Sequence, residues 1–305
     1  MPEVKVATRE NIGHFRSSVS FAHYLGRYRT AMAAMPVPDR VIDAPTSFGT
    51  VRVYRFPAAQ PGPVGPPIVL LPGRNASAAM YRGNLPSLLR RRQAYCLDLL
   101  GEPGLSVQHK PIRDAEDQAQ WLDETLSALG IAPPHLLGTS IGGWSAVNFA
   151  VRRPGRVASL TLLDAVMTFD RIPVPVLVAS IGLVIPGMPQ FVRRRTLSWI
   201  SGGADLDVAV AEGELIAAGT ADFALRLPAP VPITDAQLRA LDTPVLAFIG
   251  GRSVMVRADR AAARARNLLR RGQIYVWPDA SHAINGEYPE EIAAQAHRFW
   301  DGVES

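Results

Sequence analysis

The sequence predicts an α/β fold with a mostly parallel sheet covered by helices on both faces. Short apolar segments alternate with helix-like segments from residue 68 onward, a rhythm typical of parallel strands joined by right-handed crossovers. Hydrophobic residues make up 48% of the 305 residues and charged residues 19%, which suits a large buried core. A glycine-rich run, Gly138–Gly143, lies between an apolar segment and a helix-like one.

The first 40 residues are expected to form a helical extension. Apolar side chains recur at helical spacing over Arg9–Met35. Pro36 and Pro38 would end this helix, because proline lacks a backbone N–H group and clashes with the preceding turn. The segments 41–42 and 51–56 then predict an antiparallel opening of the sheet.

The alternation of strands and helices follows this opening. In chain order we expect a strand at 68–71, a helix ending near Arg92, a strand at 94–100, a helix at 114–129, a strand at 135–139, a helix after the glycine-rich run, strands at 157–163 and 244–249, a helix up to Arg271 and a strand at 274–277. Residues 169–241 break this rhythm and are too long for a plain connection. The expected domains are therefore an N-terminal helical extension (1–40), an α/β core (41–168 and 242–305) and an inserted helical lid (169–241).

The glycine-rich run contains the pattern Gly-x-Ser-x-Gly around Ser140. Between a strand and a helix this pattern is typical of a nucleophile elbow. The serine then lies on a turn too tight for bulky neighbours, beside a helix N-terminus whose N–H groups favour an oxyanion. An ordinary glycine-rich turn can carry the same five residues, so the rest of the sequence has to decide.

Four segments make the chain resemble an α/β-hydrolase from about residue 41 to 303. The first, Leu70–Arg74, is similar to a strand-end His-Gly-x motif, with Pro72 in place of the histidine, and the second, Leu97–Ser106, is similar to an Asp-x-x-Gly-x-Gly-x-Ser loop. The third is the elbow. The fourth, Pro278–His282 followed by Pro289–Glu291, is similar to the histidine loop and final helix of lidded esterases.

This resemblance implies two-step acyl transfer. Ser140 would attack an ester-like carbonyl while His282 takes its proton, and water would then cleave the acyl-enzyme. The oxyanion donors would be the backbone N–H groups of Ile141 and Arg74. The side chain of Arg74 either contacts a substrate carboxylate or lies on the surface, and the sequence leaves both open.

The acid of the triad departs from the family pattern. The resemblance places it in a Gly-x-x-Asp turn after 244–249, where this chain has Ser253. We expect Asp164, at the end of the preceding strand, to be the acid, because some relatives place it there and the order Ser, Asp, His is kept. A helix or loop cap is the other interpretation of Asp164. Asp98 is expected to be structural, and Glu287 to cap the final helix.

The favoured function is a serine esterase for small or medium hydrophobic carboxylic esters. An apolar lid segment such as 176–185 suits such a substrate, although these side chains could equally form the core of the lid. The serine at the usual acid position leaves an alternative, a protein of this fold that binds a ligand or guides a rearrangement without hydrolysis. The sequence shows no metal-ligand spacing and no dinucleotide fingerprint, so we expect neither metal nor cofactor.

The composition of the chain bears on which kinds of partner it can bind. The net charge of +5 comes from arginine, as in 90–92 and 193–195, but without interleaved aromatic residues these clusters do not favour nucleic acid. Cys96, the single cysteine, lies in an apolar run and is expected to be a buried bystander.

The chain shows no secretory signal, and its apolar segment 176–185 is about half the length of a membrane span. We therefore expect a cytoplasmic protein without stable membrane insertion; a homo-oligomer is left open.

Overall fold

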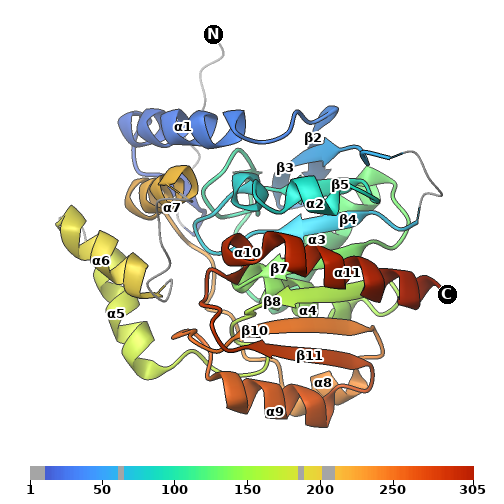
Figure 1. The fold of residues 1–305 in the computed structure, drawn as a ribbon. Helices are drawn as coiled ribbons and strands as arrows, with labels where there is room; N and C mark the ends of the chain where they lie inside the picture. Colours follow the sequence, from blue (N-terminus) through green and yellow to red (C-terminus); the bar gives the residue numbers. More distant parts are fainter. Residues whose placement is uncertain (1–10, 61–64, 185–188, 201–209) are drawn as a thin grey trace.

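A central sheet organises the protein (Figure 1). The computed structural model describes residues 11–60, 65–184, 189–200 and 210–305. The strands of the sheet are β2 (Arg40–Thr46), β3 (Gly49–Phe56), β4 (Ile68–Leu71), β5 (Ala94–Leu97), β6 (Val107–Gln108), β7 (His135–Thr139), β8 (Ser159–Leu163), β10 (Val245–Gly250) and β11 (Gly272–Trp277). Their spatial order is β11-β10-β8-β7-β4-β5-β3-β2, and β6 pairs with β3. The pairs that involve β3 are antiparallel, and all the others in this order are parallel.

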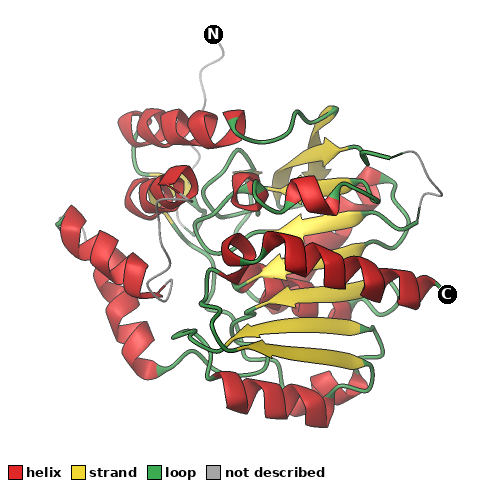
Figure 2. Cartoon of the chain, viewed as in Figure 1, coloured by secondary structure: helices red, strands yellow, loops and turns green. Residues whose placement is uncertain are grey.

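Helices cover both faces of this sheet (Figure 2). One face carries α3 (Ala115–Leu129), α4 (Ile141–Arg152), α8 (Asp235–Ala240) and α9 (Ala258–Leu268), which contact one another in this order. The other face carries α2 (Leu85–Leu88), α10 (Ile284–Glu287) and α11 (Pro289–Glu304), and α1 (Ser18–Ala33) packs on the short 3₁₀ helix η1 (Ala78–Tyr81). The predicted fold class is confirmed.

The alternation of side chains along each strand builds two separate cores. In β4, Val69 and Leu71 belong to the core under α3 and α4, whereas Ile68 and Leu70 belong to the core under α11. Successive side chains of a strand point to opposite faces. Because both faces of this sheet are covered, both sets must be apolar, which explains the uninterrupted apolar run of Ile68–Leu71.

The N-terminal segment differs from its prediction as one helix over Arg9–Met35. Helix α1 begins only at Ser18, because Ser17 is extended and its side chain accepts a hydrogen bond from the backbone N–H of Ser20. Before it, β1 (His14–Phe15) pairs antiparallel with β9 (Phe223–Ala224). The prediction of helix is therefore wrong for residues 11–17, while residues 9 and 10 lie outside the described part of the chain.

Two predicted elements of the core are shorter than expected. The helix expected to end near Arg92 consists only of η1 and α2, and Pro86 lies in the first turn of α2. The strand expected to reach residue 100 ends at Leu97, and the chain turns at Gly101, whose φ of +82° suits glycine.

Between residues 169 and 241 the structure contains α5 (Val174–Val184), α6 (Gln190–Ile200), α7 (Val210–Asp222), β9 and α8. Helix α5 contacts α6 and α7, α7 packs on α1, and α8 packs on α4 and α9. Helices α5, α6 and α7 lie beyond the carboxyl ends of the parallel strands (Figures 1 and 2). Within the described residues, every helix is too short or too polar to cross a membrane.

Candidate active site

Ser140 occupies a sharp turn between β7 and α4. Its backbone angles are φ 54° and ψ −117°, a conformation that is strained for a residue with a Cβ atom. The turn is tight around it. A Cβ atom added at Gly138 would lie 2.4 Å from the carbonyl oxygen of Gly142, and one added at Gly142 would lie 2.0 Å from that of Leu71. Close backbone approach therefore requires both glycines, as a nucleophile elbow does.

His282 reaches Ser140 from the loop between β11 and α10. Its Nε2 atom lies 3.0 Å from Oγ of Ser140. The loop is held by Glu287, whose carboxylate accepts hydrogen bonds from N and Oγ of Ser281 at 2.8 and 2.7 Å. The prediction that Glu287 caps the final helix is wrong, because its carboxylate is turned toward the loop that carries His282.

Asp164, directly after β8, supplies the carboxylate beside His282. Its Oδ2 atom lies 2.6 Å from Nδ1 of His282, and its Oδ1 atom accepts a hydrogen bond from the N–H of Gly250 at 3.0 Å. The side chain is fully buried. A carboxylate fixed in this way can hold the imidazole in one tautomer and orientation. The fold thus brings together Ser140, His282 and Asp164 from three different connections.

The hydroxyl at the usual acid position contacts the carboxylate. Ser253 Oγ donates a hydrogen bond to Asp164 Oδ2 at 2.5 Å and accepts one from the N–H of Met255 at 3.2 Å. One oxygen of Asp164 therefore faces both Ser253 and His282. Sequence reasoning missed this contact, although the serine in the acid turn was its signal, because 89 positions separate the two residues.

Both residues predicted to supply oxyanion donors lie next to Ser140. Ile141 follows Ser140 as the first residue of α4. Arg74 follows Gly73, and a Cβ atom added at Gly73 would lie 3.6 Å from Cβ of Ser140. The segment Gly73–Asn75, called here the oxyanion loop, thus runs alongside the elbow.

The side chain of Arg74 is paired with Glu102. Nη1 of Arg74 donates a hydrogen bond to Oε1 of Glu102 at 2.5 Å, and Oε2 of Glu102 accepts one from the N–H of Asn75 at 3.1 Å. Glu102 is 2% exposed and Arg74 is 31% exposed. Burial raises the pKa of Glu102 above its usual value, while the charge of Arg74 opposes this rise. Sequence reasoning missed Glu102, although it lies in the loop that carries the family resemblance after β5.

Asp98 has the contacts of a structural residue. This buried carboxylate accepts hydrogen bonds from the N–H groups of Ala78 and Leu105 and from the hydroxyl of Tyr28, at 2.9, 2.8 and 2.8 Å. It thereby joins α1, η1 and the loop after β5. Cys96 is buried in β5, the strand that ends just before Asp98, and burial, with a smaller contribution from Asp98, raises the pKa of its thiol.

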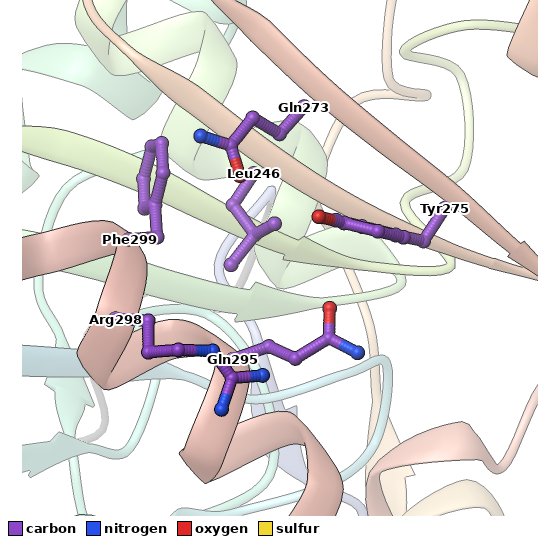
Figure 3. Close-up of a pocket in the computed structure, with 6 residues that line it drawn as sticks. All are labelled: Leu246, Gln273, Tyr275, Gln295, Arg298 and Phe299. Atoms are coloured by element: carbon purple, nitrogen blue, oxygen red, sulfur yellow. The ribbon is translucent and has the colours of Figure 1, made fainter. Parts of the chain in front are cut away.

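Two cavities lie away from these residues. One of about 330 Å³ lies between β10, β11 and α11 (Figure 3), and its lining consists of Leu246, Gln273, Tyr275, Gln295, Arg298 and Phe299. The other, of about 300 Å³, is bordered by α4, α8 and the segments before β8 and β10. Neither lining includes the residues brought together at Ser140. Over the described ranges, no three His, Cys, Asp or Glu side chains gather as metal ligands would.

Comparison with known proteins gives consistent matches over most of the chain. It is 26% identical over 286 residues to the uncharacterized carboxylesterase nap of Bacillus subtilis (strain 168), which covers 91% of this chain and 92% of that protein. It is 24% identical over 296 residues to carboxylesterase YbfK of the same strain, covering 94% and 97%. The crystal structure of naproxen esterase (carboxylesterase NP) from Bacillus subtilis superimposes with a TM-score of 0.84 at 25% identity, covering 93% of this chain and 99% of that one.

The sequence profile described as "Alpha/beta hydrolase family" matches residues 68–295. This range begins at β4, ends within α11 and contains the elbow, Asp164 and His282. The protein therefore belongs to the alpha/beta hydrolase family.

Proposed function

We propose that this alpha/beta hydrolase cleaves carboxylic esters through an acyl-enzyme formed on Ser140. The observation that carries the proposal is the continuous chain of contacts from Ser140 Oγ to His282 Nε2 at 3.0 Å and from His282 Nδ1 to Asp164 Oδ2 at 2.6 Å. Both distances are within hydrogen-bond reach. Two relatives named carboxylesterases, each similar over more than nine-tenths of the chain, support the same reaction.

In the first step, Oγ of Ser140 attacks the ester carbonyl carbon and gives its proton to Nε2 of His282. The carbonyl oxygen becomes an oxyanion that the N–H groups of Ile141 and Arg74 would stabilise. When the intermediate collapses, the bond to the alkoxy oxygen breaks, and His282 returns the proton to the departing alcohol. Asp164 compensates the charge of the imidazolium throughout.

In the second step, water attacks the acyl group on Ser140 and His282 again takes a proton. Collapse of this second intermediate breaks the bond to Oγ, which recovers its proton from His282 and releases the carboxylic acid. The same groups therefore serve both halves of the reaction, and no cofactor is needed.

The segment between residues 169 and 241 would act as the lid, with 1–40 as an extension and 41–168 and 242–305 as the core. Helices α5, α6 and α7 lie beyond the strand ends that carry Ser140 (Figure 1). Apolar side chains on α5 and α6 are exposed, namely Val174, Leu177, Val178, Phe191 and Trp199. Exposed apolar side chains on this segment favour a small or medium hydrophobic ester over a charged one.

The test is labelling with a fluorophosphonate together with hydrolysis of p-nitrophenyl esters of increasing acyl length. We expect stoichiometric modification of Ser140, loss of hydrolysis in Ser140→Ala, and higher kcat/KM for butyrate or hexanoate than for acetate. Ser145→Ala is the matched control, because this serine lies on α4 and its hydroxyl donates only to the carbonyl of Ile141.

Folded wild-type protein that neither reacts with the probe nor hydrolyses any ester would refute the proposal. That outcome would favour the alternative of a non-hydrolytic binding protein. The alternative arises from the serine at the usual acid position, and the carboxylate of Asp164 beside His282 weakens its basis.

A further inference from the structure

The oxyanion loop is shaped by contacts that lie outside the groups that would touch substrate. Asn75 has a positive φ of 58°, a left-handed conformation that is uncommon outside glycine and that asparagine adopts more readily than most residues. The loop also turns on itself, since the N–H of Ala76 donates to the carbonyl of Gly73 at 3.2 Å. The carbonyl of Gly73 and the N–H of Arg74 belong to the same peptide unit, which therefore lies within this turn.

We propose that Glu102 is a positioning residue that aligns the N–H of Arg74 for the oxyanion. The inference rests on the proposed function. Glu102 accepts from the loop twice, once from the guanidinium of Arg74 and once from the N–H of Asn75. One contact is made by the side chain that branches from Cα of Arg74, and the other by the N–H of the next peptide, so the carboxylate fixes the side chain and the backbone that directly follow the N–H of Arg74.

Glu102 is well suited to this task because it is itself fixed. It follows Gly101 in the turn after β5, and its own N–H donates to the carbonyl of Leu99 at 3.2 Å. The side chain is 2% exposed, so water competes little for its oxygens, and hydrogen bonds to an ionised group are stronger than those between neutral groups. Through Glu102, the oxyanion loop is thereby held in a fixed position relative to the end of β5.

Helix α7 provides a second set of contacts to the loop. Nδ2 of Asn75 donates to Oγ1 of Thr220 at 3.0 Å, and a Cβ atom added at Gly219 would lie 2.9 Å from the carbonyl oxygen of Asn75. The loop is therefore held between β5, through Glu102, and α7. Both supports are buried, and of the two only Glu102 can carry a charge.

The test is Glu102→Gln. A neutral amide can accept from Arg74 or from Asn75 N–H through its one oxygen, but its NH₂ group then faces the other donor, so one of the two contacts is lost. We expect kcat to fall on the order of 10- to 100-fold, less than for complete loss of an oxyanion donor. KM should change less than about 3-fold, since ground-state binding does not use the aligned N–H.

Inhibitor affinity separates positioning from a merely structural role. A trifluoromethyl ketone, which becomes tetrahedral on Ser140, should bind Glu102→Gln more weakly by about the factor lost in kcat. A planar amide analogue of the substrate should bind both forms alike. Glu124→Gln is the matched control, because Glu124 also accepts from a backbone N–H and a side chain, those of Ser47, and is expected to keep wild-type kcat.

Three outcomes would each overturn the inference while leaving the proposed function intact. They are an equal loss of affinity for the two inhibitors in Glu102→Gln, an unchanged kcat in Glu102→Gln, and a fall in the kcat of Glu124→Gln equal to that of Glu102→Gln. Arg74→Met, which keeps the backbone N–H but removes the other partner of the pair, should show the same selective loss, and wild-type kcat there would also count against it. Wild-type protein whose Ser140 does not react with the fluorophosphonate would overturn the proposed function and this inference together.

Discussion

At the scale of single residues, the decisive contacts meet at one oxygen of Asp164. Oδ2 faces both Nδ1 of His282 at 2.6 Å and the hydroxyl of Ser253 at 2.5 Å. A hydroxyl has no charge and cannot compensate an imidazolium, but it can donate to the carboxylate that does. Under the proposed mechanism, Ser253 therefore supports Asp164 from the position where the family usually has the acid itself.

We expect Asp164→Asn to lower kcat/KM about 1,000- to 10,000-fold, because an amide can stabilise the wrong imidazole tautomer and carries no charge. Ser253→Ala should lower it only about 3- to 10-fold, the effect of one lost hydrogen bond. Adding Ser253→Asp to Asp164→Asn should restore part of the activity, since a carboxylate at 253 would approach Nδ1 of His282. Initial rates with p-nitrophenyl butyrate measure all three.

Asp242→Asn is the control for these substitutions, because Asp242 has a side chain that is 80% exposed and pairs with Arg270 on the surface. Wild-type rates in Asp164→Asn would show that this carboxylate is not the acid. An equally low rate in Ser253→Ala would show that the hydroxyl of Ser253 is as necessary for activity as the carboxylate, and would contradict the smaller effect expected for one lost hydrogen bond.

At the scale of elements, helix α1 is tied into the core through one buried hydroxyl. Tyr28 of α1 donates to Asp98 at 2.8 Å, and its oxygen lies 2.6 Å from the hydroxyl of Tyr54. Burial, and then the nearby charge of Asp98, raise the pKa of Tyr28, so it remains a neutral donor. On its other side α1 packs on α7. The helix thus connects the loop after β5 with the segment beyond the strand ends.

We expect Tyr28→Phe to lower the free energy of unfolding by about 1–3 kcal/mol, because the buried carboxylate of Asp98 loses a donor without gaining water. Urea unfolding followed by circular dichroism measures this change. Tyr275→Phe is the matched control, since Tyr275 is 40% exposed, and it should change the free energy of unfolding by less than about 0.5 kcal/mol. Equal free energies of unfolding for the wild type and Tyr28→Phe would mean that the hydrogen bond from Tyr28 to Asp98 does not contribute to stability.

At the scale of the whole molecule, the carboxyl and amino ends of the parallel strands carry different groups of residues. The carboxyl ends of β7, β8 and β10 present Ser140, Asp164 and the Ser253 turn, as expected for sites in parallel sheets. The amino end is closed by the last helix. There His135, fully buried at the start of β7, contacts Ser159 Oγ and Oε1 of Glu304, each at 2.8 Å.

This amino-end contact predicts a pH dependence of stability. Burial lowers the pKa of His135 from 6.5 to about 4, although the contact with Glu304 opposes the shift. The unfolded chain therefore binds a proton at higher pH than the folded one, so stability is complete above about pH 6.5 and falls as the pH drops toward 4. The lost free energy is about 3 kcal/mol in total.

His135→Gln should flatten this part of the curve of unfolding free energy against pH, because glutamine does not titrate. Urea midpoints and slopes at half-unit steps from pH 4 to 8 measure it, and the difference between the two proteins removes the contributions of other groups. Parallel curves for the wild type and the variant would contradict the prediction.

The sequence by itself determined the fold class, the elbow at Ser140 and the loop of His282. These features are local, because the period of apolar residues and the spacing of glycines depend on neighbours a few positions away. It placed the helix at 114–129 well, since Asp114 caps it and Gly130 ends it. It failed at residues 11–17, where pairing of β1 with the distant β9 replaces the expected helix.

The sequence favoured Asp164 as the partner of His282, but only the tertiary structure decided between this interpretation and a cap, and what Ser253, Glu102 and Glu287 contact. The bond from Asp164 to His282 spans 118 positions, and it exists because β8 lies between β7 and β10 in the sheet. Strand order depends on the packing of the whole chain, which no local pattern encodes. Glu102 likewise meets Asn75 only because β4 and β5 are neighbours, so the support of the oxyanion loop became visible only in three dimensions.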